Sequence, residues 1–167
     1  MPNPATHILV PLILADLYRD YIAKKKFPLF YVLVAGIAGL LPDIDIAIWR
    51  IIGFFREVSV SSVHRQFTHT IFIPLLFLMA ALLMRKNRKA KLLFGMASFG
   101  IFTHLVLDAI FSGSIMPFYP FSELSFGLNL ALFTGMQPQM LFAVFDGILL
   151  GGWLIHEYVK HMIKDFI

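Results

Sequence analysis

The sequence predicts an all-α integral membrane protein, a helical bundle of four to five transmembrane helices. The composition is 59% hydrophobic and only 14% charged, with a mean hydropathy of +0.79, which is far more apolar than a soluble domain of this length. Apolar segments recur along the chain, each close to the ~20 residues that cross a bilayer as a helix. Lipid cannot form hydrogen bonds with backbone N–H and C=O groups, so these groups must bond to one another within the membrane. A closed β-barrel would also satisfy them, but five spans are too few to form one. We therefore expect helices only.

Five apolar segments are the candidate spans: 5–23, 27–48, 67–84, 92–111 and 140–158. Pro11 and Asp16 interrupt the first, which either spans the membrane or lies at its interface, and the second alternative leaves four spans. Residues 50–66 and 112–139 are rich in Ser, Gly, Pro and aromatics and predict re-entrant or interfacial loops with short helices. No linker divides the chain, so we expect one domain over residues 1–167.

Basic residues predict the orientation of the bundle. They gather at residues 24–26, 85–91 and 160–164, which five alternating helices would place on one face. The positive-inside rule makes that face cytoplasmic and predicts a multi-pass protein of the plasma or inner membrane. These clusters border apolar runs, so they are topology signals, and no nucleic-acid partner is expected. The two loops and the N-terminus then lie on the non-cytoplasmic face.

Ionisable residues recur at one depth within the apolar segments. At 1.5 Å per helical residue, His7, Asp43, His69, His104 and Asp108 lie about 20 to 26 Å from the nearest basic cluster. That depth is near the non-cytoplasmic edge of a hydrocarbon core about 30 Å thick. Convergence at a common depth predicts a single site, although helix ends also tolerate isolated polar residues.

Local spacing supports shared ligation. His104 and Asp108 are four residues apart, so both lie on one face of a helix and can reach one ion. Pro42 disfavours helical geometry at the residue before it, so Asp43 and Asp45 are expected at a helix end, where they can turn inward. One of these carboxylates can ligate while the other orients a histidine. The competing interpretation of Asp43 and Asp45 is a polar helix terminus. That of His104 and Asp108 is a hydrogen-bonded structural pair.

The sequence His-Arg-Gln-Phe-Thr-His adds two histidines. His64 and His69 would diverge by about 140° on one helix, so His64 is expected in the preceding loop, and Thr68 is predicted to cap the helix that carries His69. Without cysteine, a metal must be held by His, Asp or Glu. Nitrogen and oxygen ligands favour zinc, with manganese or iron as alternatives.

At these residues the chain resembles the membrane-bound, metal-dependent hydrolase family, the YdjM-like group of bacteria and archaea. The matching pieces, in the family's order, are His7, Pro42-Asp43-Ile44-Asp45, His64-Arg65, Thr68-His69-Thr70, His104 with Asp108, and the stretch 113–120. Ile46 departs from the family where many relatives have His, and Thr70 stands where Ser is usual.

The resemblance implies a phosphoesterase-like hydrolase, because the family is grouped with zinc-dependent phospholipase C enzymes. We expect the divalent metal, zinc above all, to be held by His7, Asp43, His64, His69, His104 and Asp108. Asp45 is expected to be a further ligand or an orienting residue, and Arg65 to clamp phosphate. A site at the bilayer edge suits a phospholipid or another lipid-linked phosphate. The rival interpretations are a small ion- or proton-coupled transporter and a non-catalytic membrane scaffold.

Overall fold

The computed structural model describes residues 2–57, 64–65 and 67–161, and in this part of the chain it confirms the all-α prediction. Six α-helices are described, and the only β-type pairing among the described residues is an isolated bridge between Ile115 and Phe126. The α-helices are α1 (Pro4–Leu17), α2 (Leu29–Ala38), α3 (Ile44–Gly53), α4 (Phe72–Leu83), α5 (Arg88–Leu107) and α6 (Pro138–His161). Shorter helical turns cover Tyr18–Ile22, Asp108–Ser112 and Leu130–Thr134. Part of the predicted 50–66 loop, residues 58–63 and 66, lies outside the described residues.

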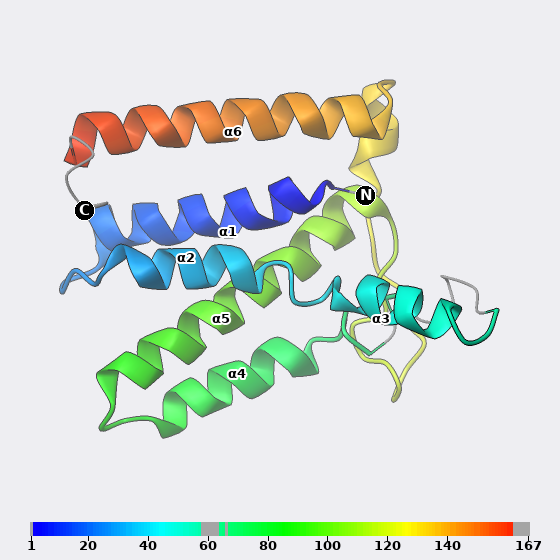
Figure 1. The fold of residues 1–167 in the computed structure, drawn as a ribbon, viewed down its shortest axis with the longest axis horizontal. Helices are drawn as coiled ribbons and strands as arrows, with labels where there is room; N and C mark the ends of the chain where they lie inside the picture. The colour runs from blue at the N-terminus through cyan, green and yellow to red at the C-terminus, as the bar shows by residue number, and fades with distance from the viewer. Residues whose placement is uncertain (1, 58–63, 66, 162–167) are drawn as a thin grey trace.

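The helices α1, α2, α4, α5 and α6 alternate in direction, with α5 packed against α1, α2 and α4, and α6 against α1 (Figure 1). The α1–α2 and α4–α5 connections and the carboxyl end of α6 lie at one end of the bundle. The start of α1, helix α3 and the segment between α5 and α6 lie at the other. The expected separation of the basic segments from the segments that bear His and Asp is therefore present in the fold.

Helix length supports fewer membrane crossings than expected. Of the described helical segments, Arg88–Ser112 with 25 residues and Pro138–Lys160 with 23 are long and apolar enough to cross a membrane. The apolar helices α2 and α4 have only 10 and 12 residues, so four to five spans are not confirmed. The predicted continuous segment 27–48 is divided because α2 ends at Ala38 and a turn through Pro42 leads into α3. Proline lacks the backbone N–H that a helix interior requires.

Two glycines allow the helices to approach closely at the end that bears the site. A Cβ on Gly39 would lie 2.0 Å from the carbonyl oxygen of His7, and one on Gly100 would lie 2.1 Å from that of Ala35. Small residues of this kind let helix backbones touch in membrane proteins. The two contacts bring α1 and α5 against α2, so that His7 and His104 approach each other from different helices.

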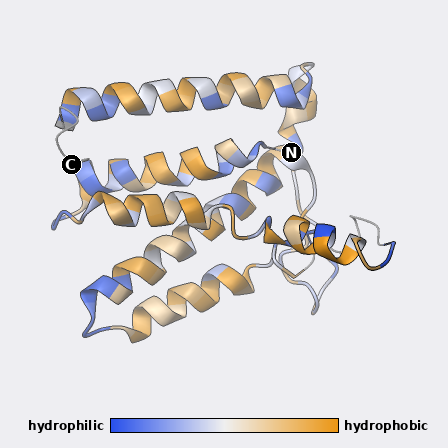
Figure 2. Ribbon diagram, in the orientation of Figure 1, coloured by the Kyte–Doolittle hydropathy of each residue, from blue (hydrophilic) through white to orange (hydrophobic). Residues whose placement is uncertain are grey.

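The exterior of the bundle is apolar. On α6, Ile148, Ile155 and Val159 are 67%, 66% and 73% exposed, and hydrophobic residues cover most of the helical ribbons in Figure 2. A continuous apolar surface of this kind marks a membrane-facing exterior, since soluble monomers rarely expose such patches.

Polar contacts join α1 to α6. The indole N–H of Trp153 donates to Asp16 at 3.1 Å, and Arg19 pairs with Asp16 and Asp20, each at 3.3 Å. At the opposite end of α6, Asp146 accepts hydrogen bonds from Asn3 and Thr6. These contacts hold α6 in place although most of its surface is exposed.

Candidate metal centre

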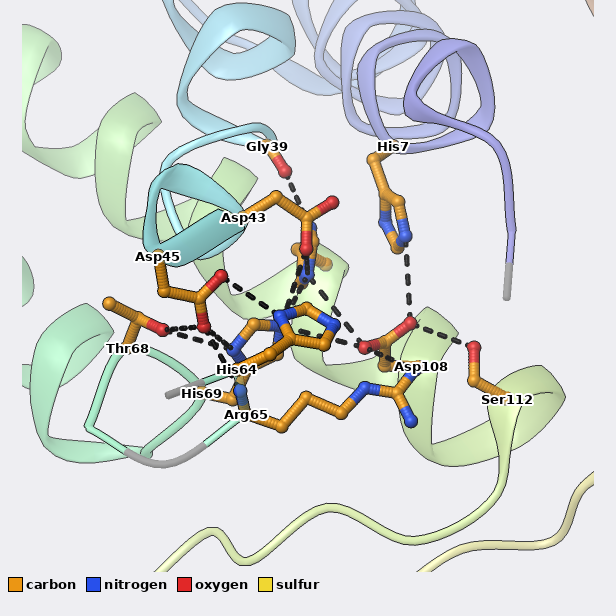
Figure 3. A network of polar contacts seen from close by, with 11 residues as sticks. His7, Gly39, Asp43, Asp45, His64, Arg65, Thr68, His69, Asp108 and Ser112 are labelled. Atoms are coloured by element: carbon orange, nitrogen blue, oxygen red, sulfur yellow. Dashed lines mark hydrogen bonds and ion pairs between the residues drawn. The ribbon is translucent and has the colours of Figure 1, made fainter. Parts of the chain in front are cut away.

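A buried cluster at the non-basic end of the bundle contains every site residue predicted from the sequence (Figure 3). Its side chains come from four parts of the chain: His7 from α1, Asp43 and Asp45 from the start of α3, His64, Arg65 and His69 from the segment before α4, and His104 and Asp108 from the end of α5. His7, His69, His104 and Asp108 are fully buried. Residues up to 101 positions apart, such as His7 and Asp108, therefore share one interior space.

Four ligand atoms form the centre of the cluster. The Nε2 atoms of His69 and His104 are 3.2 Å apart. Asp43 Oδ1 lies 3.5 Å from His69 Nε2 and 3.6 Å from His104 Nε2. Asp108 Oδ2 lies 3.6 Å from His69 Nε2 and 3.9 Å from His104 Nε2. Each of these four atoms faces at least two of the others.

The other ring nitrogen of each histidine fixes its tautomer. His104 Nδ1 lies 2.7 Å from the carbonyl oxygen of Gly39, which can only accept, so Nδ1 carries the proton. His69 Nδ1 lies 3.1 Å from Thr68 Oγ1 and 3.4 Å from Asp45 Oδ2. The Thr68 hydroxyl already donates to Asp45 at 2.7 Å, so it accepts from His69. Both Nε2 atoms therefore turn a lone pair toward the centre.

The four central atoms are therefore the two Nε2 nitrogens and two carboxylate oxygens. Each offers a lone pair, and none carries a proton when both imidazoles are neutral. Asp43 Oδ1 and Asp108 Oδ2 are buried and accept no hydrogen bond. Around a tetrahedral zinc with bonds of about 2.0 to 2.1 Å, neighbouring ligand atoms lie about 3.4 Å apart. Asp43 Oδ1, His69 Nε2 and His104 Nε2 lie 3.2 to 3.6 Å from one another, close to this value, so these three atoms fit a divalent metal ion. Asp108 Oδ2 lies 3.6 and 3.9 Å from the two nitrogens and borders this set of three.

The charge of the cluster also fits a divalent cation. With neutral imidazoles, the carboxylates of Asp43, Asp45 and Asp108 and the single guanidinium of Arg65 leave a net charge of −2 in the network of Figure 3. Buried charge of one sign is strongly unfavourable without a counter-charge. One divalent ion supplies that counter-charge.

Asp45 orients the cluster from one side. Besides Thr68, its carboxylate accepts from His64 Nδ1 at 2.9 Å and from the backbone N–H of Arg65 at 3.0 Å. Burial opposes ionisation of Asp45, but the hydrogen bonds from His64, His69, Arg65 and Thr68 outweigh it and hold the pKa far below its ordinary value. The carboxylate therefore stays charged, and with both oxygens engaged it acts here as the residue that positions His69.

Thr68 does not cap a helix, contrary to the sequence-based expectation, and His69 does not lie on one. Helix α4 begins at Phe72 with Ile71 at its N-cap, and the Thr68 hydroxyl is used by Asp45 and His69. The carboxylate of Asp45 is the stronger acceptor for this hydroxyl and draws the segment toward α3. The placement of His64 in the preceding segment is confirmed.

His7 and His64 flank the central atoms. His7 stacks on the His104 ring at 3.8 Å, and its Nε2 is 3.6 Å from Asp108 Oδ1. Neither ring nitrogen of His7 has a hydrogen-bond partner, although both are buried. His64 is separated from the central atoms by Asp45, and its Nε2 is also buried without a partner. Both imidazoles can hold a proton or a further ion.

Arg65 and Ser112 complete the surroundings of Asp108. Arg65 Nη2 lies 3.1 Å from Asp108 Oδ2, and the Ser112 hydroxyl donates to Oδ1 at 2.9 Å. Arg65 adopts a left-handed backbone with φ of 66°, which non-glycine residues seldom do. The sequence analysis did not select Ser112 or the Gly39 carbonyl. The spacing of four residues from Asp108 was the available signal for Ser112.

An apolar helical bundle with a buried His/Asp cluster at one end defines a helical membrane protein with a candidate metal site. The family model of the YdjM inner membrane protein matches residues 1–165, so the chain belongs to the YdjM inner membrane protein family. The family description gives a location in the inner membrane and names no reaction. Neither the curated proteins nor the solved structures contain a match to the chain.

Proposed function

We propose that this protein is a membrane-embedded, metal-dependent hydrolase that acts on a phosphate ester. The observation that supports the proposal best is the meeting of lone-pair atoms from His69, His104, Asp43 and Asp108 in one cluster, in which three of the side chains are fully buried and that of Asp43 is 15% exposed. A structural hydrogen-bond network would place a donor opposite each acceptor. Here the donors point outward to Gly39, Thr68 and Asp45, as they do around metal-bound histidines.

His69, His104 and Asp43 would hold the ion, with Asp108 beside them as a further ligand after a small shift of its side chain. Zinc fits a set of imidazoles and carboxylates best. Manganese and iron are alternatives with the same ligand types. When bound, a divalent ion supplies Lewis acidity and a water whose pKa is lowered to about 7. His7 on one side and His64 on the other can bind a second ion or a proton.

The residues around the four central atoms suit phosphoryl transfer. The guanidinium of Arg65 borders the cluster, and its Nε has no hydrogen-bond partner. A planar guanidinium donates two parallel hydrogen bonds to phosphate oxygens. The His64–Asp45 pair presents an unpartnered Nε2 that can accept a proton from water and later return it to the leaving group.

The position of the cluster suggests a lipid-linked phosphate as substrate. Residues 113–129 lie beside the segment that carries His69, where the Phe67 and Tyr119 rings are 4.9 Å apart. Phe118 and Phe121 are 45% and 83% exposed and flank Tyr119, and tyrosine is enriched at membrane interfaces. A head group can then reach the cluster while its tail stays in the bilayer. The basic connections at the opposite end support a non-cytoplasmic location for this face under the positive-inside rule.

Elemental analysis of the purified protein, combined with hydrolysis assays on phospholipids and water-soluble phosphate esters, tests the proposal. We expect stoichiometric zinc, manganese or iron and release of a phosphate-containing product. His104→Ala should lose both metal and turnover. His156→Ala is the matched control, because His156 lies on α6 near Asp16 and Asp20, outside the cluster.

Two results would reject the proposal. One is a folded protein without bound metal after addition of each candidate ion. The other is full turnover in the His104→Ala variant. Bound metal without hydrolysis of any ester, together with uptake of an ion gradient in proteoliposomes, would favour a transporter instead.

A further inference from the structure

A large cavity lies at the basic end of the bundle, away from the metal centre. It has a volume of about 1010 Å³ and runs between α1, α4 and α5. Its walls are mainly apolar and include Leu14, Tyr18, Leu78, Leu82, Met96 and Phe99. The volume is at the upper end of the range of ligand pockets, about 300 to 1,000 Å³. The cavity is therefore large enough for a hydrocarbon chain.

Three cations border this cavity. Arg85, Arg88 and Lys91 line it where α4 passes into α5, and all three are exposed. Among the described residues, no carboxylate lies within 4.0 Å of any of them, whereas Lys26 nearby pairs with Asp20. The Arg88 guanidinium donates only to the backbone carbonyl of Lys25, at 3.5 Å. Their positive charge is thus free to interact with an external anion.

We propose that this cavity, an open groove between α1, α4 and α5, binds an anionic phospholipid from the leaflet that contacts the basic connections. An acyl chain would lie along the apolar walls of the groove, with the lipid phosphate at Arg85, Arg88 and Lys91. Apolar walls with a cationic rim match an amphipathic anion, and basic pockets between membrane helices bind anionic head groups. Inorganic phosphate would leave the apolar walls uncovered. The groove is not the hydrolytic site, because Lys91 is about 20 Å along α5 from His104.

Native mass spectrometry of the detergent-solubilised protein with phosphatidylglycerol and phosphatidylcholine in equal amounts tests the proposal. We expect the wild-type chain to retain phosphatidylglycerol preferentially. The triple variant Arg85→Gln, Arg88→Gln, Lys91→Gln should lose this preference by roughly 10- to 100-fold. A matched triple variant, Lys86→Gln, Lys89→Gln, Lys24→Gln, removes the same charge from exposed residues that do not line the groove and should keep it.

A second variant tests the apolar part of the groove without changing charge. A Cβ on Gly95 would meet only the Ala81 Cβ, at 4.0 Å, so Gly95→Leu can fill the space without displacing backbone. It should lose bound phosphatidylglycerol, whereas Gly147→Leu on α6, where a Cβ meets nothing within 4 Å, should not. Circular dichroism confirms that each variant is folded.

Three lipid-binding results would overturn the inference. They are equal retention of the two lipids by the wild-type chain, equal losses in the two triple variants, and full retention of phosphatidylglycerol by Gly95→Leu. A dimer mass that replaces the lipid adducts would assign the groove to a second copy of the chain and would overturn it as well. None of these results depends on hydrolytic activity, so the inference can fail independently of the proposed function.

Discussion

Asp45→Asn separates a residue that orients a metal ligand from a metal ligand itself. The substitution keeps the side-chain size but removes the charge and one of two acceptor oxygens. Asp45 accepts from His64, the Arg65 backbone and Thr68 at 2.9, 3.0 and 2.7 Å, and an amide cannot accept all three on one oxygen. His69 Nδ1, 3.4 Å from Asp45, then loses the charge that fixes its tautomer.

The structure predicts a moderate weakening of metal binding. Residues that orient a ligating histidine typically change metal affinity about 10- to 100-fold, which corresponds to about 1.4 to 2.7 kcal/mol. The four central ligand atoms remain in Asp45→Asn, so the ion should still bind. Competition with a chelator of known affinity, at fixed pH in detergent, measures the change in Kd.

Asp16→Asn is the matched control, because Asp16 is an equally buried carboxylate that lies at the other end of α1 and pairs with Arg19. Its metal affinity should equal that of the wild type. An unchanged Kd in Asp45→Asn would refute the orienting role. A loss of more than about 10⁴-fold would also refute it, since Asp45 would then be a ligand.

Three further predictions concern packing, protonation and substrate binding. Gly39→Ala must move α1 away from α2, so it should destabilise the protein by about 1 to 3 kcal/mol in thermal unfolding. Gly147→Ala is the control and should not destabilise it, because a Cβ there meets nothing within 4 Å. Equal stabilities of the two variants would contradict the proposed close packing. Burial opposes protonation of His69, but the neighbouring carboxylates of Asp43 and Asp45 raise its pKa. In titrations across pH the metal affinity should therefore weaken as pH falls through that pKa, and a flat profile would contradict proton competition. Arg65→Lys removes the planar guanidinium, which can donate two parallel hydrogen bonds to phosphate, and should lower kcat/KM about 10- to 100-fold in the ester assay with metal content unchanged. Unchanged kinetics would exclude a contact between Arg65 and phosphate.

Much of the architecture follows from the sequence because lipid permits few alternatives. Apolar composition and segment length predict a helical bundle. Distance from the basic clusters predicts axial depth, and His7, Asp43, His69 and Asp108 do meet in one cluster. The spacing of four between His104 and Asp108 places both in one centre, where His104 Nε2 lies 3.9 Å from Asp108 Oδ2. These features depend on helix geometry alone.

The remaining features depend on tertiary contacts that segment patterns do not contain. Pro42 predicts a helix end at Asp43 and Asp45, and α3 confirms it by beginning at Ile44 with Asp43 at its N-cap. Neither Pro42 nor the hydropathy of residues 27–48 predicts that α2 already ends at Ala38. Thr68 has a capping composition, but its hydroxyl finds a stronger acceptor in Asp45. Close packing at Gly39 and Gly100 sets the rotation of each helix about its axis. This rotation places the Gly39 carbonyl where it accepts a hydrogen bond from His104 Nδ1.

The most direct test is to locate the metal by anomalous diffraction from crystals of the purified protein. We expect a peak within about 2.0 to 2.2 Å of His69 Nε2, His104 Nε2 and Asp43 Oδ1, next to the carboxylate of Asp108. A peak at Asp16, Asp20, His156 and Glu157 instead, the other described group that could hold an ion, or no peak in metal-loaded crystals, would contradict it.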